Sequence, residues 1–315
     1  MEDKISEEIT EIKKAEDAEI AYEFYKKADF TDHISEEMKK QGYTFGCWET
    51  FFRGEATALY PNSIAGLFRS DKITLLAKDE YKYLTEILTK CSKYFETDEE
   101  MNTFLDKVAK IQHYGGYTRL LDFSHSFLVS LYFACDKHSD KDGCIYRYTT
   151  DFLNMAGRAP LEEKKILELY MQYSGESEED LESFFSRNGF QVSAIEDFIS
   201  RNHFIELNYS SSRMENQKGL FLYMGENSFK EHKGLKEKPI PINSTNGRGK
   251  EYPGLVRKII VQADAKEEIL SYLKTEHSID KDFIYTTEPK LQWKDELENA
   301  IEDINKPYLK KRQGL

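Results

Sequence analysis

Residues 124–138 contain the most apolar helical pattern of the chain, and this stretch restricts how the rest can fold. Phe127, Leu128, Leu131 and Tyr132 recur at helical spacing, and apolar residues also fill positions between them. A helix that is apolar on most sides must be surrounded by other elements. The sequence therefore predicts a domain built around a central, buried helix.

The composition fits a domain with a sizeable core and argues against several classes of protein. The 315 residues include 20 Tyr and 20 Phe, enough apolar material for one large domain or two smaller ones. A formal net charge of −13 argues against bulk non-specific binding to nucleic acid, because such binding neutralises phosphates. No apolar run is long enough to cross a bilayer, so we expect no membrane partner.

The N-terminus and the cysteines predict a cytoplasmic protein. Residues 1–8 lack the basic and apolar regions of a signal peptide. The four cysteines are spread along the chain, without a CxxC pair or the cysteine and histidine spacing of a zinc site. We therefore expect reduced thiols, no bound metal and a cytoplasmic location.

Strand and helix patterns are interspersed without the regular period of a doubly wound sheet. Strand patterns occur at residues 43–53, 143–148, 204–207, 219–224 and 255–262. Helical patterns occur at residues 78–94, 97–111, 124–138 and 160–202, after Asp264 and from about Pro289. This order predicts an α+β fold in which helices surround a small mixed sheet.

We expect three segments along the chain. Residues 1–40 carry isoleucines at helical spacing and predict a helical arm that packs on the core or binds a protein partner. Residues 41–287 form the main α+β domain. Residues 288–315 form a C-terminal helix and a basic tail.

An arginine and a glycine stand at the end of the first predicted strand. The aromatic run at 45–51 leads into Phe52, Arg53 and Gly54. Arginine is rarely buried without a partner, so Arg53 either points into a site or pairs with a carboxylate such as Glu55. In the first case the guanidinium suits an anion, and the glycine lets a ligand approach the backbone.

A second group of polar residues follows the helix predicted at 97–111. Two glycines end that helix after His113, and Arg119 and Asp122 follow three residues apart. In a structural interpretation Arg119 pairs with Asp122 and His113 caps a carbonyl group. In a functional one His113 binds phosphate or transfers a proton, since its pKa lies near neutrality. Both interpretations stay open at this point.

Together these stretches resemble the FRG-domain family, which is named after its Phe-Arg-Gly motif. The matching residues are Phe52 to Gly54, Gln112 to Gly115, Thr118 to Asp122, Leu131 to Ala134 and Arg213 to Phe221. The resemblance extends over roughly residues 40–225, and more weakly to about residue 285. Gly116, Tyr117 and Phe123 depart from the family pattern, but none of these departures removes a polar group.

An arginine followed by a glycine on the first strand is also similar to the arrangement by which many ADP-ribosyltransferases hold NAD. This resemblance implies an ADP-ribosyltransferase-like fold and an NAD-consuming activity, of the bacterial toxin or anti-phage defence type. NAD is then the substrate. Its expected binding residues are Arg53, Gly54, Tyr114, Arg119 and Gln217. The resemblance does not fix which glutamate is catalytic: Glu206 and Glu215 are the best placed, and the expected catalytic residues are Glu206 and His113.

Two other classes of function remain open. The same arginines suit a non-catalytic module that binds a nucleotide or a nucleic-acid end. Alternatively, Arg53, Arg119 and Asp122 form a buried ion network in a structural or interaction domain. Glu206, between apolar neighbours on a predicted strand, is either catalytic or half exposed on the strand face. A single pocket shared by the candidate residues would favour ligand binding.

Overall fold

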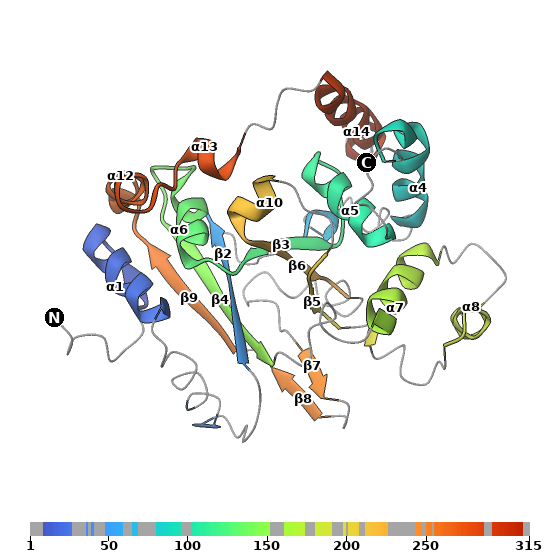
Figure 1. Ribbon diagram of the computed structural model, residues 1–315, viewed down its shortest axis with the longest axis horizontal. Helices are drawn as coiled ribbons and strands as arrows, with labels where there is room; N and C mark the ends of the chain where they lie inside the picture. The colour runs from blue at the N-terminus through green and yellow to red at the C-terminus, as the bar shows by residue number, and fades with distance from the viewer. Residues whose placement is uncertain are drawn as a thin grey trace.

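The computed structural model has an α+β fold, as the sequence predicted, with helices on both faces of a mixed sheet (Figure 1). It describes residues 9–26, 36, 39–40, 48–58, 65–68, 80–95, 103–151, 161–173, 180–190, 198–199, 201–207, 212–225, 243–246, 250–253, 255–286 and 292–310. Within these residues, none of the helices combines the length and hydrophobicity needed to cross a bilayer.

Seven strands form the sheet in the order β1-β9-β4-β2-β3-β6-β5. They are β1 (Glu11–Ile12), β2 (Trp48–Glu55), β3 (Leu120–Ser124), β4 (Gly143–Asp151), β5 (His203–Ile205), β6 (Gly219–Tyr223) and β9 (Leu255–Val261). β1 and β9 are parallel, and the other neighbours are antiparallel. A separate two-stranded sheet contains β7 (Asn243–Asn246) and β8 (Lys250–Pro253).

The seven-stranded sheet divides between β2 and β3. β2 pairs with β4 from Trp48 to Glu55, but it pairs with β3 at a single position, Phe52 opposite Ser124. β3 instead pairs along its whole length with β6. Figure 1 shows β2 and β3 running at a steep angle to each other. The two halves of the sheet therefore separate beyond Phe52, and this separation leaves room for side chains.

Helix α6 (Phe127–Cys135) is the central helix that the sequence predicted. All of its residues except Phe133 are buried, and it packs against β2 and β4. Helices α1 (Ala15–Lys26) and α12 (Lys266–His277) lie beside α6 on this face of the sheet (Figure 1). The three helices share one apolar core with Phe52, Ile145 and Ile259 of the sheet.

Gly54 and Gly143 let α6 approach the sheet closely. A Cβ atom on residue 54 would lie 1.8 Å from the carbonyl oxygen of Ser130 and 2.9 Å from the backbone nitrogen of Ala134. A Cβ atom on residue 143 would lie 2.2 Å from the carbonyl oxygen of Ala134. The glycine of the Phe-Arg-Gly motif is therefore required by helix packing, whereas the sequence indicated a close approach of ligand.

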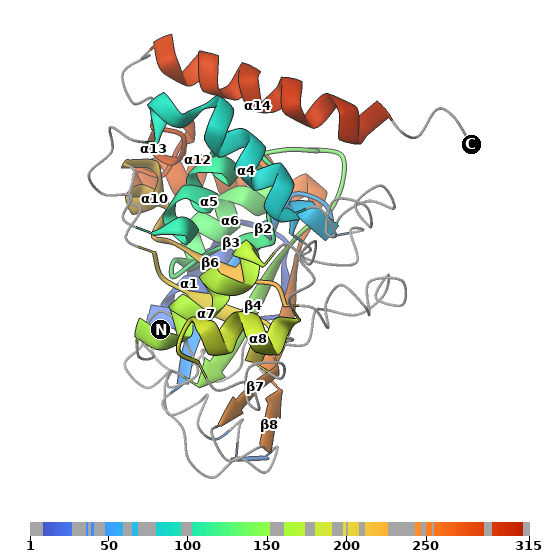
Figure 2. The ribbon, with the colours of Figure 1, turned by 90° about the vertical axis from the view of Figure 1, so that its right-hand side faces the viewer.

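Helices α4 (Glu80–Lys90), α5 (Phe104–His113), α7 (Leu161–Gln172) and α14 (Gln292–Lys310) belong to the other side of the sheet. Figure 2 shows α14 along the outer side of α4, far from β7 and β8. Leu297, Ile301 and Ile304 of α14 are buried in the same core as α4 and α5. The C-terminal helix thus belongs to the packed domain.

Some element boundaries differ from those that the sequence predicted. Helix α5 begins at Phe104 rather than near residue 97, because the Thr103 hydroxyl accepts from the backbone N–H of Asp106 in a reciprocal capping box. β1, which was not predicted, places residues 11–12 of the N-terminal segment in the sheet, and Ile12 is fully buried. The pattern at 43–47 lies outside the described residues.

Candidate functional site

A cavity of about 240 Å³ opens where β2 and β3 separate. Its walls come from β2, β3, β6, α5, α6 and α10 (Ser212–Gln217). The polar side chains of the wall include Arg53, Gln112, His113, Asp122, Arg213 and Gln217. The apolar wall includes Phe52, Phe123, Phe133 and Phe221. Side chains from three distant parts of the chain therefore surround one space.

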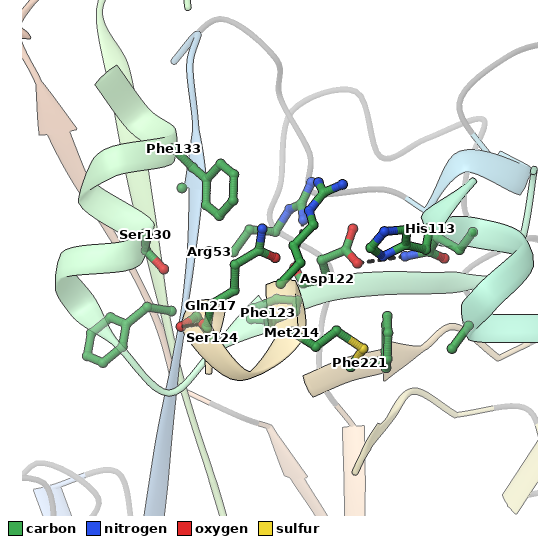
Figure 3. Close-up of a pocket in the computed structure, with 15 residues that line it drawn as sticks. Arg53, His113, Asp122, Phe123, Ser124, Ser130, Phe133, Met214, Gln217 and Phe221 are labelled. Atoms are coloured by element: carbon green, nitrogen blue, oxygen red, sulfur yellow. Dashed lines mark hydrogen bonds between the residues drawn. The ribbon is translucent and has the colours of Figure 1, made fainter. Parts of the chain in front are cut away.

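The arrangement brings together some of the residues that the sequence singled out. Arg53, His113 and Gln217 line the cavity, and so does Gly54. Figure 3 shows Asp122 between Arg53 and His113, with Gln217 and Phe133 on the other side of Arg53. Asp122 belonged to the sequence motif, but it was not predicted as a ligand or catalytic residue.

Arg53 is held in place by two parts of the sheet. Its Nε donates to Glu55 Oε1 at 2.9 Å, and its Nη1 donates to the backbone oxygen of Asp122 at 2.6 Å. Burial lowers the pKa of the guanidinium, but Glu55 and Asp122 together raise it above its ordinary value. Within the described part of the chain, these bonds use two of five N–H donors, so Arg53 is a fixed cation with further capacity to bind.

Asp122 is an exposed carboxylate that a chain of hydrogen bonds orients. The Thr118 hydroxyl donates to Gln112 Oε1, and Gln112 Nε2 donates to Asp122 Oδ1 at 2.9 Å. Thr118 is itself buried, and its oxygen accepts from the backbone N–H of Leu120. The motif from Gln112 to Asp122 thus positions one carboxylate at the cavity.

His113 is neutral at physiological pH in this environment. Burial lowers its pKa from 6.5 to about 4, and the nearby charges of Arg213, Lys294 and Lys110 act in the same direction, against the opposing charge of Asp122. The sequence had indicated a pKa near neutrality. A neutral imidazole can donate or accept a hydrogen bond, but it does not supply a positive charge to the cavity.

Helix α10 contributes Arg213 and Gln217 to the cavity. The Gln217 Nε2 donates to the backbone oxygen of Ile284 at 3.0 Å, so its amide nitrogen is already engaged. An amide held in this way offers its carbonyl oxygen as an acceptor to a ligand. The Arg213 guanidinium lies over the ring of Tyr285.

Arg119 lies outside the lining of the cavity. It is buried in a two-pronged ion pair with Glu80, and its Nη1 donates to Tyr223 Oη at 3.2 Å. Arg119 precedes β3 and is buried against Glu80, whereas Asp122 lies within β3 and is exposed. The interpretation in which Arg119 pairs with Asp122 is therefore wrong: the buried network that includes Arg119 is formed with Glu80.

Glu206 and Tyr114 also lie outside the lining of the cavity. Glu206 follows the edge strand β5, is about one-third exposed and pairs with His125 at 3.3 Å. Tyr114 is buried in the apolar core, and its ring contacts that of His113. The carboxylate that lines the cavity is Asp122 rather than Glu206. Among the described residues, no group of His, Cys, Asp or Glu has the geometry of a metal site.

The comparison with known families agrees with the motif. Residues 49–143 match the family model of the FRG domain, which confirms the predicted resemblance to the FRG-domain family over this range. The range includes Arg53, His113 and Asp122, whereas α10 with Arg213 and Gln217 follows it. No curated protein and no solved structure matches the chain.

Proposed function

We propose that the cavity between β2 and β3 binds NAD and that this FRG-domain protein is an ADP-ribosyltransferase-like enzyme or another NAD-consuming effector of the toxin or defence type. One observation carries the proposal: Arg53, Asp122 and Gln217, which are far apart in the sequence, line a single cavity. Cations, an amide and aromatic rings suit the phosphates, the carboxamide and the flat bases of a pyridine dinucleotide, and a carboxylate suits the chemistry at its ribose.

The arginines supply the attraction for phosphate. The whole chain carries a formal charge of −13, so a phosphorylated ligand needs local cations to enter. Arg53 of β2 and Arg213 of α10 both line the cavity. One guanidinium group can donate two parallel hydrogen bonds to phosphate oxygens, which suits the pyrophosphate of a dinucleotide.

The apolar wall and Gln217 suit the nicotinamide end. Phe133, Phe123 and Phe221 offer ring faces and edges against which a flat base packs. The Gln217 carbonyl oxygen can accept from the N–H of a carboxamide, because its amide nitrogen is bound to Ile284. A volume of about 240 Å³ holds part of a dinucleotide, so the adenosine end extends outward.

Asp122 is the carboxylate proposed to act in the reaction. The bond between ribose C1 and the nicotinamide nitrogen breaks, and nicotinamide leaves as a neutral base with the bonding electron pair. The oxocarbenium-like ribose is positive, and a carboxylate fixed by Gln112 stabilises that charge. Water or an acceptor nucleophile then adds to C1 and releases its proton to solvent.

His113 has a supporting part in this proposal. With a pKa near 4 it stays neutral at physiological pH, so it contributes hydrogen bonds rather than a proton for the leaving group. Nicotinamide leaves without needing protonation, because its ring nitrogen carries the positive charge before the bond breaks. The chemistry is therefore compatible with a neutral imidazole beside the site.

The test is nicotinamide release by the full-length protein. Purified protein is incubated with NAD, alone and with cell extract that supplies acceptors, and nicotinamide is measured by chromatography. The proposal is supported if nicotinamide release disappears in Asp122→Asn and persists in Arg187→Ala. Arg187 is an exposed residue of α8 (Leu181–Arg187) and serves as the control. No release and no transfer of label from NAD under either condition would refute the enzymatic function.

A non-catalytic nucleotide-binding module is the second candidate. The position of Glu206 favours this candidate, because the carboxylate that the sequence predicted to be catalytic lies outside the cavity lining and pairs with His125. Calorimetry with ADP-ribose separates the two functions. Binding of ADP-ribose that Arg213→Ala weakens, without release of nicotinamide from NAD, assigns the protein to the second class.

A further inference from the structure

Helix α10 has only six residues, and it is fixed by the segment that follows α12. The Asn216 side chain donates to the backbone oxygen of Phe283 at 2.9 Å, and Gln217 donates to that of Ile284 at 3.0 Å. Both acceptors lie in α13 (Lys281–Ile284). The position of α10, and so of its side chains in the cavity, depends on this C-terminal segment.

Tyr285 links that segment to the cavity. The guanidinium carbon of Arg213 lies 5.2 Å from the centre of the Tyr285 ring. A cation over an aromatic face is attracted by the ring, and a long arginine side chain is thereby restricted to fewer rotamers. Arg213 itself lines the cavity, so the ring contacts the arginine next to where ligand is expected.

The hydroxyl end of the Tyr285 side chain is bonded to Asp136, the residue that caps the C-terminus of α6. Its hydroxyl donates to Asp136 Oδ2 at 2.7 Å, and the Tyr132 hydroxyl donates to Asp136 Oδ1 at 3.0 Å. The Tyr285 ring also contacts Phe133, an apolar residue of the cavity wall, edge to face. Burial raises the pKa of Tyr285, and the hydrogen bond to Asp136 raises it further, so the hydroxyl remains a donor.

We propose that Tyr285 is a positioning residue, which holds the Arg213 guanidinium toward the cavity so that it binds the pyrophosphate of a dinucleotide. This inference rests on the proposed nucleotide-binding function of the cavity. The ring restricts Arg213 to fewer conformations before ligand binds, so less conformational entropy is lost on binding. Tyr285 does not contact the reacting atoms, and its effect should fall on the phosphorylated part of the ligand.

The test compares ADP-ribose with nicotinamide, by calorimetry on the full-length protein. We expect Tyr285→Leu to weaken ADP-ribose binding by about tenfold, equivalent to about 1.4 kcal/mol, and to leave nicotinamide binding within about twofold. Tyr285→Phe keeps the ring and should stay within about threefold of wild type. Adding Tyr285→Leu to Arg213→Ala should cause no further loss, because the ring acts through that arginine.

Arg213→Lys tests the same idea without altering Tyr285. Lysine keeps the charge but lacks the planar group that stacks on the ring, so we expect an affinity close to that of Arg213→Ala. This variant decides the matter if Tyr285→Leu does not fold. A lysine variant with wild-type affinity would show that charge alone is required, and it would overturn the inference.

The outcomes separate the inference from the function on which it rests. Wild-type protein that binds neither ADP-ribose nor NAD refutes both. Wild-type binding with unchanged affinity in Tyr285→Leu, or with losses that add to those of Arg213→Ala, refutes the positioning role alone. Loss of nicotinamide binding in a folded Tyr285→Leu protein would indicate general damage to the cavity, and it would also count against the inference.

Discussion

The guanidinium of Arg53 crosses the gap between β2 and β3 and donates to the backbone oxygen of Asp122, with 2.6 Å between Nη1 and O. This bond joins the two halves of the sheet beyond the one position where the strands pair, Phe52 opposite Ser124. The same side chain binds Glu55 through Nε. One arginine therefore connects two strands and contributes to the cavity between them.

Replacing Arg53 with lysine should destabilise the protein. An ammonium group cannot reach both Glu55 and the Asp122 carbonyl with the geometry of a guanidinium, so one partly buried acceptor loses its donor. We expect a loss of about 1–3 kcal/mol in the free energy of unfolding, measured by urea titration. Arg187→Lys, at an exposed position of α8, should change it by less than about 0.5 kcal/mol. Equal losses in both variants would contradict the bridging role.

Asp122→Asn should strongly reduce turnover and preserve the fold. Asparagine has the same shape and can still accept from Gln112, but it lacks the negative charge that stabilises a positive ribose. The expected loss in kcat is about 10²–10³-fold, measured as nicotinamide release, with ADP-ribose still bound. Glu206→Gln is the matched comparison, because it removes the carboxylate that the sequence predicted. If Glu206→Gln loses turnover and Asp122→Asn does not, the sequence-based assignment is the correct one.

Gly54→Ala should be strongly destabilising through helix packing. The new methyl group would lie 1.8 Å from the Ser130 oxygen, and backbone atoms of α6 cannot move away as a flexible side chain would. We expect a loss of about 3 kcal/mol or more in the free energy of unfolding. Gly66→Ala is the control, since its nearest atom, Tyr117 Cδ1, would lie 3.6 Å away. If the midpoint of thermal unfolding is as high in Gly54→Ala as in the control, α6 does not pack tightly against β2 at this position.

His113 should make the protein less stable in mild acid. Its pKa is about 4 in the folded protein and near 6.5 when unfolded, so below pH 6.5 the unfolded chain takes up a proton that the folded state does not. Stability from this group is complete above pH 6.5 and falls as the pH drops toward 4. At 1.36 kcal/mol per pKa unit, the full loss is about 3 kcal/mol.

The pH effect of His113 is measured against a variant that cannot titrate. Urea titrations of wild type and His113→Gln at pH 7.5 and pH 4 cancel the contribution of the carboxylates, which both proteins share. The wild type should lose about 3 kcal/mol more than the variant over this range. An identical pH dependence in the two proteins would mean that His113 titrates normally in the folded state.

The sequence predicted those features that depend on local pattern. The apolar residues of 124–138 predicted a buried central helix, and α6 is that helix. The Phe-Arg-Gly and Gln112–Asp122 stretches predicted a polar site, and Arg53 and His113 line one cavity. Both features depend on burial and turn chemistry, which neighbouring residues in the sequence determine.

Features that depend on distant pairing could not be predicted in the same way. Arg119 forms an ion pair with Glu80 of α4, and no sequence pattern indicates that partner. Arg213 lies on α10, which is bonded to α13 through Asn216, a contact across 67 residues of sequence, and its guanidinium lies over the Tyr285 ring. A local sequence pattern does not reveal contacts between segments so far apart.

The strand order has a consequence for any attempt to isolate the segment that matches the FRG-domain model. Residues 49–143 include β3 but not its partner β6, and they end at the first residue of β4, which pairs with β2. Cut out alone, this segment would expose unpaired backbone N–H and C=O groups on both β2 and β3. We expect it to aggregate or remain unfolded, so the portion recognised by sequence is smaller than the portion that folds.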